Sequence, residues 1–251
     1  MRATRRIFGV TPVWLASSLV AASILAAPAA RALEVSDPLE PVNRVIYGLN
    51  ELVDLMLLGP LAEAYGELPS PVRTGVRNVL DNLSAPVTFA NDLLQGETDR
   101  AGTTFARFFI NSTLGLFGLF DLAGQLGHPA HKEDFGQTLA VWGVGEGPFL
   151  MLPLLGPSTL RDTAGLAVDM LAFDPLAHAP SSEPRIARGI GEAVDTRHRI
   201  DPVIRDVRRN SLDPYATVRS AYVQRRAAEI RNRRPGTGDP RYESIFREEE
   251  E

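Results

Sequence analysis

Apolar residues recur every three or four positions along much of the chain, a pattern that predicts amphipathic helices. One such run extends from Val45 to Met56 and is expected to end at Gly59-Pro60. Ser70-Pro71 supplies a cap and a proline at the first helical position of the next helix. Pro86 is expected to open a further, short helix that Gly96 closes.

Two apolar segments depart from this periodicity because glycine and proline interrupt them. Leu114 to Gly127 mixes large apolar side chains with glycines, each of which costs a helix about 1 kcal/mol relative to alanine, so a hydrophobic hairpin or broken helix is predicted. Trp142 to Leu155 has a similar composition, and its run Phe149 to Leu152 predicts a short strand. Thr159 and Asp162 then form a capping-box pattern at the start of another helix.

The two ends of the chain have the composition of segments outside the folded domain. Residues 1–32 have the form of an export signal, with arginines ahead of an apolar stretch and Ala30-Arg31-Ala32 as a cleavage pattern. A twin-arginine and a general secretory signal both fit, and a retained membrane anchor is the alternative. Residues 233–251 end in four glutamates and are poor in apolar residues, which predicts a disordered acidic tail.

Residues 33–232 are predicted to form one helical domain. No stretch of it is long and uncharged enough to cross a bilayer as a straight helix. The chain has no cysteine, so none is available for acylation after the signal. Residues 33–184 carry 7 basic and 19 acidic side chains, a net charge of −12, whereas residues 185–234 carry 13 and 6, a net charge of +7. The basic block is expected to face anionic lipid headgroups or the acidic part of the same chain.

One cluster of residues superficially resembles a metal site. His128, His131, Glu133 and Asp134 lie within seven residues, but they match no standard ligand spacing. Pro129 also disfavours a helix that would align the two histidines. A solvated loop explains these residues better, and no metal is expected.

Catalytic and nucleotide-binding motifs are also incomplete. Ser158 and Thr159 lie outside any Gly-x-Ser-x-Gly elbow and are expected to cap a helix. The glycines of residues 143–147 come without the lysine of a phosphate-binding loop, and Glu146 among them would repel phosphate. The sequence therefore predicts no enzyme and no cofactor, and an exported acidic chain is not expected to bind nucleic acid.

Four ordered motifs carry a family resemblance. They are Asp37-Pro38-Leu39-Glu40-Pro41-Val42-Asn43-Arg44; Asp134-Phe135-Gly136-Gln137-Thr138-Leu139 with Trp142-Gly143-Val144-Gly145 and Gly147-Pro148; Leu152-Pro153 through Gly156-Pro157-Ser158-Thr159-Leu160-Arg161-Asp162; and Ser211-Leu212-Asp213-Pro214-Tyr215 with Arg219, Tyr222 and Arg225. Together they resemble the MlaA (VacJ) family of outer-membrane lipid-asymmetry proteins, from Asp37 to about Ile230.

The resemblance implies an all-α protein whose amphipathic helices form a ring around a central channel, with glycine- and proline-broken apolar hairpin segments. Such a ring would lie in the periplasmic leaflet of the outer membrane, beside porin trimers. It would remove mislocalised phospholipids from the outer leaflet and pass them to a soluble periplasmic carrier, without hydrolysis. Many family members have an acylated cysteine that this chain lacks, so its apolar rim and its partners would have to hold it in the membrane.

Two sets of candidate residues follow. Those expected to face membrane lipid are Phe117, Phe120, Trp142, Phe149, Leu150 and Leu152. Those expected to form the channel or its polar framework are Asp37, Asn43, Arg44, Asp134, Arg161, Asp162, Asp213 and Tyr215. Two other interpretations remain open: a soluble periplasmic lipid-binding or porin-associated scaffold protein, and a lipid hydrolase that would use Ser158.

Overall fold

The computed structural model describes residues 36–231, so the predicted export signal and acidic tail lie outside the described residues. Within this range the fold is helical with one small hairpin, in agreement with the all-α prediction. The elements are α2 (Glu40–Val53), π-helix η1 (Asp54–Leu58), α3 (Gly59–Gly66), α4 (Ser70–Leu94), α5 (Thr98–Thr113), α6 (Leu122–Gln125), α7 (Phe135–Val141), β1 (Phe149–Leu152), β2 (Gly156–Thr159), α8 (Leu160–Val168), π-helix η2 (Asp169–Phe173), 3-10 helix η3 (Pro175–His178), α9 (Glu183–Asn210) and α10 (Pro214–Arg231).

The helix that begins near Val45 does not end at Gly59-Pro60. The π-turn η1 carries the chain through this point, with the Gly59 N–H donating to the Asp54 carbonyl, and Pro60 falls in the first turn of α3, where a missing N–H costs little. The continuous stretch Glu40–Gly66 is long and apolar enough, by length and composition alone, to cross a membrane. By length and composition, this stretch contradicts the prediction that no segment could cross a bilayer as a straight helix.

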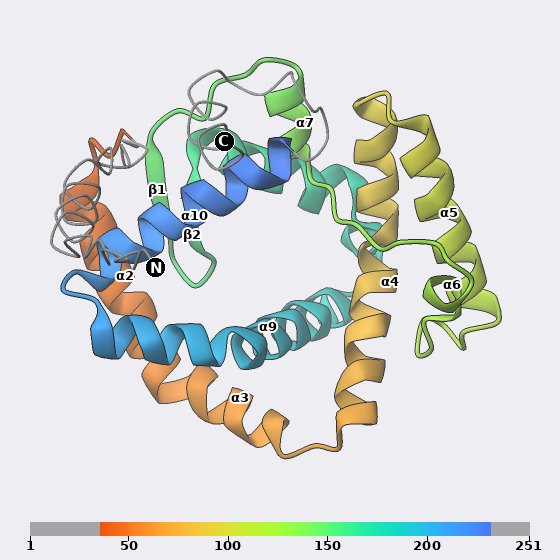
Figure 1. The fold of residues 1–251 in the computed structure, drawn as a ribbon, viewed down its shortest axis with the longest axis horizontal. Coiled ribbons are helices and arrows are strands. Elements are labelled where there is room, and N and C mark those ends of the chain that lie inside the picture. Colours follow the sequence, from red (N-terminus) through yellow and green to blue (C-terminus); the bar gives the residue numbers. More distant parts are fainter. Residues whose placement is uncertain (1–35, 232–251) are drawn as a thin grey trace, which may run out of the picture. The chain divides into compact units, whose positions relative to one another are not determined.

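α4 and α9 also continue through internal prolines. α4 runs past Pro86, so the predicted short helix from Pro86 to Gly96 is instead the second half of a 25-residue helix. α9 likewise contains Pro202. α4 packs lengthwise against α5 and also contacts α9, which in turn contacts α3 (Figure 1). These tertiary contacts offset the backbone hydrogen bond that each proline removes.

The two glycine-rich apolar segments are irregular, as predicted. Residues 114–120 form successive turns in which Leu116 and Phe117 adopt positive φ angles of 53° and 59°, and only the short α6 follows. The Phe149–Leu152 strand is confirmed: β1 pairs antiparallel with β2, in a register that sets Phe149 opposite Thr159. Thr159 Oγ1 then accepts the Asp162 N–H at 3.2 Å and caps α8, as the capping-box pattern predicts.

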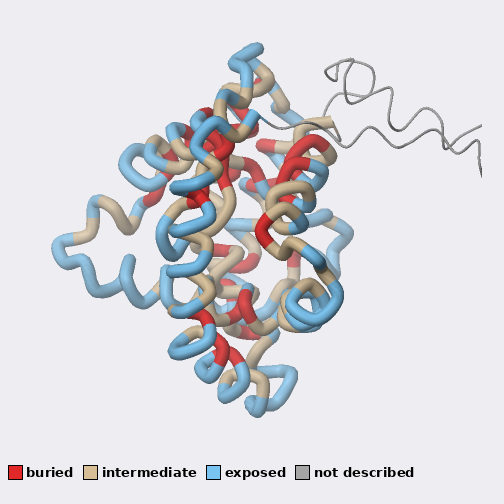
Figure 2. Tube along the Cα trace, turned by 90° about the vertical axis from the view of Figure 1, so that its left-hand side faces the viewer, coloured by how far each residue is buried: buried red, intermediate tan, exposed pale blue. Residues whose placement is uncertain are grey.

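The interior is unusually polar. The buried hydrophobic residues in the described range are Ala62, Ala101, Ala123, Phe149, Met151, Tyr215, Tyr222, Val223 and Ala227. Many more large hydrophobic side chains are exposed, while asparagine, aspartate and arginine side chains are buried beside that small core. Figure 2 shows the buried positions as short stretches of the chain that alternate with exposed turns. A water-soluble domain has the opposite distribution.

Candidate functional site

The amino-terminal motif meets the carboxyl-terminal helix and the β-hairpin in one hydrogen-bond network. Asp37 accepts hydrogen bonds from Asn43 Nδ2 at 2.8 Å, the Tyr215 hydroxyl at 2.5 Å and Arg219 at 2.8 Å. Asn43 also donates to the Phe149 carbonyl at 3.1 Å and accepts the Met151 N–H at 2.9 Å. Burial alone would raise the pKa of Asp37, but these donors hold it below its ordinary value. The network fixes the hairpin against α2 and α10.

Arg44 and Asp213 form a second link between the same two ends of the chain. The Arg44 guanidinium donates to both Asp213 oxygens, at 3.1 and 2.6 Å. Asp213 also accepts the Ala216 N–H at 3.1 Å, in the first turn of α10. The Arg44 hydrogen bonds lower the pKa of Asp213 to about 2. This exposed carboxylate therefore serves both as an ion-pair partner and as a helix cap.

A third network surrounds Arg226 of α10. Its guanidinium donates to Asp134 at 2.7 and 2.6 Å and to Asp162 at 3.0 Å. Asp162 also accepts hydrogen bonds from the Tyr222 hydroxyl at 2.6 Å and from Arg161 at 3.0 Å. Burial would raise the pKa of Asp162, but the positive charge of Arg226 is the main influence that lowers it to about 2. The ion pairs of Arg226 therefore link α7, α8 and α10.

All eight residues predicted for the channel or polar framework lie in these three networks: Asp37, Asn43, Arg44, Asp134, Arg161, Asp162, Asp213 and Tyr215. None of them lines the cavities found beside α4. Their contacts are those of a bracing framework, and their role toward lipid stays a prediction.

The cavity with the richest chemistry lies between α4, η2 and α9, and we call it the α4–α9 cavity. It has a volume of about 370 Å³ and mixes apolar side chains such as Leu80 and Met170 with basic and acidic ones. The polar residues that α4 contributes form a stripe at helical spacing: Arg77, Asp81, Ser84 and Thr88. Sequence reasoning missed this stripe, although its spacing of three and four residues was visible.

Two ion clusters face this cavity. In the first, the buried Asp195 carboxylate accepts hydrogen bonds from Arg199 at 2.9 Å, Tyr65 at 3.0 Å and Arg77 at 3.4 Å. Burial would raise the pKa of Asp195, but these donors lower it, so the group is ionised at neutral pH.

In the second cluster, Arg188 donates a hydrogen bond to Glu192 at 2.9 Å and forms an ion pair with Asp174 at 3.0 Å. Ser84 of α4 accepts a hydrogen bond from Arg188 at 3.0 Å and donates one to Glu192 at 3.3 Å. The cavity wall is therefore charged on both α4 and α9.

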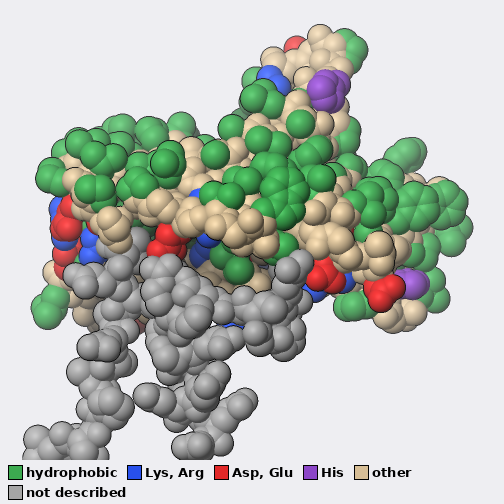
Figure 3. All heavy atoms as spheres, turned by 90° about the horizontal axis from the view of Figure 1, so that it is seen from above, with side chains coloured by type: hydrophobic (Ala, Val, Ile, Leu, Met, Phe, Trp, Pro, Cys, Tyr) green, Lys and Arg blue, Asp and Glu red, His purple; other side chains and the backbone are tan. Residues whose placement is uncertain are grey.

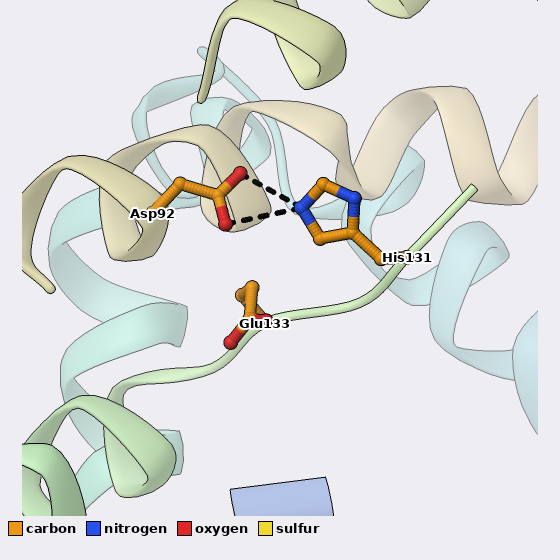
Figure 4. Close-up of side chains that lie close together, drawn as sticks. All are labelled: Asp92, His131 and Glu133. Carbon is orange, nitrogen blue, oxygen red and sulfur yellow. Dashed lines mark hydrogen bonds and ion pairs between the residues drawn. The ribbon is translucent and has the colours of Figure 1, made fainter. Parts of the chain in front are cut away.

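Asp92, His131 and Glu133 are the described residues best placed to hold a metal ion, since one ligand atom of each lies within 4.8 Å of the others (Figure 4). His131 Nε2 lies 2.9 and 3.0 Å from the two Asp92 oxygens. Arg100 donates to Glu133 at 2.7 Å and lies 3.9 Å from Asp92, so a guanidinium already supplies positive charge. The arrangement is a buried ion network.

The sequence suggested a different grouping of these residues. His131 and Glu133 are joined by Asp92 from α4, which lies 39 residues before His131. His128 and Asp134 do not belong to the group: the His128 carbonyl accepts from Arg107, and Asp134 binds Arg226. Chain proximity alone could not reveal the contribution of α4.

The residues predicted to face lipid divide into three groups by exposure. Phe117, Phe120 and Trp142 are exposed, with 82%, 52% and 53% of their surface accessible. Leu150 and Leu152 are half-buried. Phe149 is fully buried, so its prediction was wrong: alternation along β1 turns this ring inward, 6.2 Å from the rings of Tyr215 and Tyr222.

Exposed apolar residues form a broad patch. In Figure 3 hydrophobic side chains cover much of the upper part of the face shown, and most of the charged side chains in view lie below them, apart from a few on the projection at the top. Both π-helices contribute to the exposed apolar surface, through Leu55 and Met56 in η1 and through Leu171 in η2. A contiguous apolar surface of this kind marks contact with lipid or with another protein.

Ser158, the candidate nucleophile of a hydrolase, is engaged within the protein. It is 7% exposed. Its hydroxyl donates to the Thr159 carbonyl at 3.2 Å and lies 2.9 Å from Thr163 Oγ1. Neither partner is a general base.

Comparison with known proteins identifies the family. The family model described as MlaA lipoprotein matches residues 35–229. The chain is 36% identical over 198 residues to the intermembrane phospholipid transport system lipoprotein MlaA of Escherichia coli K12, covering 76% of each chain. It is 32% identical over 195 residues to the protein of the same name from Haemophilus influenzae, covering 76% of this chain and 78% of that one.

A Rickettsia felis protein of uncharacterized function is 35% identical over 199 residues, covering 79% of each chain. A solved structure from work on the structural basis for maintenance of bacterial outer membrane lipid asymmetry matches with a TM-score of 0.70 at 36% identity, covering 78% of this chain and 99% of that one. With the fold and the three framework networks, these matches establish that the chain belongs to the MlaA lipoprotein family.

Proposed function

We propose that this protein is the outer-membrane component of a phospholipid transport system that maintains lipid asymmetry. In this role it takes phospholipids that have reached the outer leaflet and moves them toward the periplasm. The observation that carries the proposal is the inverted packing: large apolar side chains lie outside, and charged networks and a charged cavity lie inside. That distribution suits a protein whose outer surface meets acyl chains and whose interior meets headgroups.

The protein lies within the periplasmic leaflet and does not cross the bilayer. Although Glu40–Gly66 is long enough to span, it buries Asn43, Asp54 and Ala62 against the rest of the fold and turns Leu49 and Met56 outward. A helix with one polar, packed face and one apolar, exposed face favours an in-plane position. Phe117, Phe120 and Trp142 belong to the lipid-facing rim.

The helices form a ring around a channel, and the α4–α9 cavity is part of its lining. α9 contacts both α3 and α4 around this region, and Figure 1 shows α9 crossing between α3 and α10. The mixed apolar and charged wall suits an amphipathic molecule, because its chains and its headgroup can both find partners.

Membrane residence rests on the rim and on porin trimers, because the chain offers no cysteine for acylation. Burying some 400 Å² of apolar surface yields about 10 kcal/mol before ordering costs, which is enough for stable attachment. The released phospholipid passes to a soluble periplasmic carrier. The engaged hydroxyl of Ser158 supports transport without hydrolysis.

The decisive experiment is a deletion strain in which phospholipid on the cell surface is quantified by labelling and by susceptibility to an external phospholipase. Surface phospholipid should rise and should fall again on complementation. An unchanged level would refute the transport role.

Carbonate washing of membranes, with and without porins, tests the embedding. A protein that leaves the membrane under both conditions would instead be a soluble lipid-binding or scaffold protein.

A further inference from the structure

The charges of the α4–α9 cavity are arranged in two groups of opposite sign. The first group consists of Arg77 and Arg199 around Asp195, so two cations share one anion and leave a net charge of +1. The second consists of Arg188 between Asp174 and Glu192, so two anions share one cation and leave a net charge of −1. We call these the positive and negative triads.

The triads are neighbours on the same face of α9. Glu192 and Asp195 are three residues apart in the helix, a spacing that brings side chains together. Both also lie against α4, through Ser84 and Arg77 respectively. A ligand that spans one helical turn therefore meets a positive and a negative site in succession.

The lining also holds charged groups outside the two triads, most of which have partners of their own. Lys132 and Asp81 form a pair at 2.7 Å, and Glu133 is paired with Arg100. Asp169 accepts hydrogen bonds from Asn91 and from the Phe135 N–H. Arg185 lies at the start of α9.

Each triad combines solvent-exposed charged groups with buried ones. Arg77 and Arg199 keep 40% and 42% of their side chains exposed, whereas the Asp195 carboxylate between them keeps 3%. Asp195 therefore positions two guanidinium groups that still have unused donors. Glu192 keeps 41% exposed, while Arg188 and Asp174 keep 12% and 11%. Glu192 is thus the accessible acceptor of the negative triad.

We infer that the α4–α9 cavity binds a zwitterionic phospholipid headgroup, with the phosphodiester on Arg77 and Arg199 and a primary ammonium on Glu192. A phosphodiester carries one negative charge, matching the positive triad. An ammonium group two methylenes away carries one positive charge, matching the negative triad. The inference rests on the proposed transport function and names the class of lipid that the channel favours.

The polarity and the volume of the α4–α9 cavity fit this headgroup. Leu80, Val87, Leu166 and Met170 complete the lining and offer contact to the glycerol and the first acyl carbons. The cavity volume of about 370 Å³ falls in the lower part of the range of small-molecule sites, which suits a headgroup with its chains outside. A headgroup with a phosphate and no ammonium would leave Glu192 facing neutral hydroxyls and would gain nothing from the negative triad.

The test uses the purified full-length protein, equilibrated with liposomes of equimolar phosphatidylethanolamine and phosphatidylglycerol and repurified in detergent. Bound lipid is then quantified by mass spectrometry. Phosphatidylethanolamine should be enriched by about threefold, the effect of one partly exposed ion pair. Glu192→Gln should abolish the enrichment without reducing total bound lipid. Arg77→Gln combined with Arg199→Gln should lower the bound amount of both lipids.

Glu63→Gln is the matched control, because Glu63 is an exposed residue of α3 outside the cavity. It should leave amount and ratio unchanged, and circular dichroism should report the same helix content for every variant. An equal lipid ratio with the unmodified protein, or a ratio unaffected by Glu192→Gln, would overturn the headgroup assignment while leaving the transport role intact. Failure to retain either lipid would overturn both.

Discussion

The contribution of Arg226 can be tested by replacing it with methionine, which has a similar length and no charge. In the folded protein this guanidinium neutralises Asp162, whose side chain is 6% exposed, and Asp134, whose side chain is 37% exposed. Arg226→Met leaves both carboxylates without their main cation. Water can solvate Asp134, so the unpaired charge of Asp162 bears most of the cost.

Loss of one partner of a buried ion pair costs about 3–5 kcal/mol. For a domain of this size each kcal/mol lowers the unfolding temperature by about 2–4 °C, so the expected decrease is roughly 6–20 °C. The assay is thermal unfolding of the detergent-purified protein, followed by circular dichroism. Helix content at low temperature should be retained, because α10 keeps its own backbone hydrogen bonds.

Arg225→Met provides the control, because Arg225 precedes Arg226, is 68% exposed and makes only weak contacts, an ion pair at 3.7 Å with Glu229 and a cation–π contact 5.9 Å from the centre of the Tyr222 ring. Its replacement should change the free energy of unfolding by less than about 0.5 kcal/mol. Equal unfolding temperatures for the two variants would refute the view that the Arg226 network holds α7, α8 and α10 together.

Four further predictions concern pH, the rim and the core. The pKa of Asp162 is lowered from 3.8 to about 2. This group therefore contributes about 2 kcal/mol of stability above pH 4, and the contribution is lost as the pH falls toward 2. Unfolding scans between pH 4 and pH 2 should reveal the loss. Burial raises the pKa of Asp169 to about 6. The contribution of this one group to stability is therefore greatest below about pH 4 and falls as the pH rises to 6, and Asp169→Asn should remove this loss in the same scans. Phe117→Ser should weaken flotation with phospholipid liposomes by about tenfold without lowering the unfolding temperature, because the ring is 82% exposed. Phe149→Ala should do the reverse, costing about 3–5 kcal/mol of stability because the ring is 0% exposed, while the folded fraction still floats; a variant of Phe149 with normal stability would contradict its place in the core.

Local signals gave the right answer where neighbouring residues decide the conformation. The Thr159–Asp162 cap, the Phe149–Leu152 strand and the irregular 114–127 segment depend on contacts within a few residues, and each was readable from the chain. The family motifs likewise contain most residues of the framework networks, although Arg226, the centre of the third network, lies outside them.

Local rules failed where distant contacts outweighed them. Proline disfavours a helix interior, yet α4 continues through Pro86 because its packing on α5 and α9 stabilises the whole helix. Gly59-Pro60 predicted an end, but a π-turn that begins at the buried Asp54 carries the helix onward, and Arg197, 143 residues away, pairs with that carboxylate.

By itself the sequence determined helical amphipathicity, the broken apolar segments and the family, since these follow from residue order. Only the tertiary structure decided that Phe149 faces inward, that Asp92 joins His131 and Glu133, and that α4 and α9 bring two charge triads into one cavity. The reason is physical. How the helices pack decides which face of a strand points inward and which side chains 39 or 118 residues apart come into contact. No periodicity along one segment encodes that arrangement.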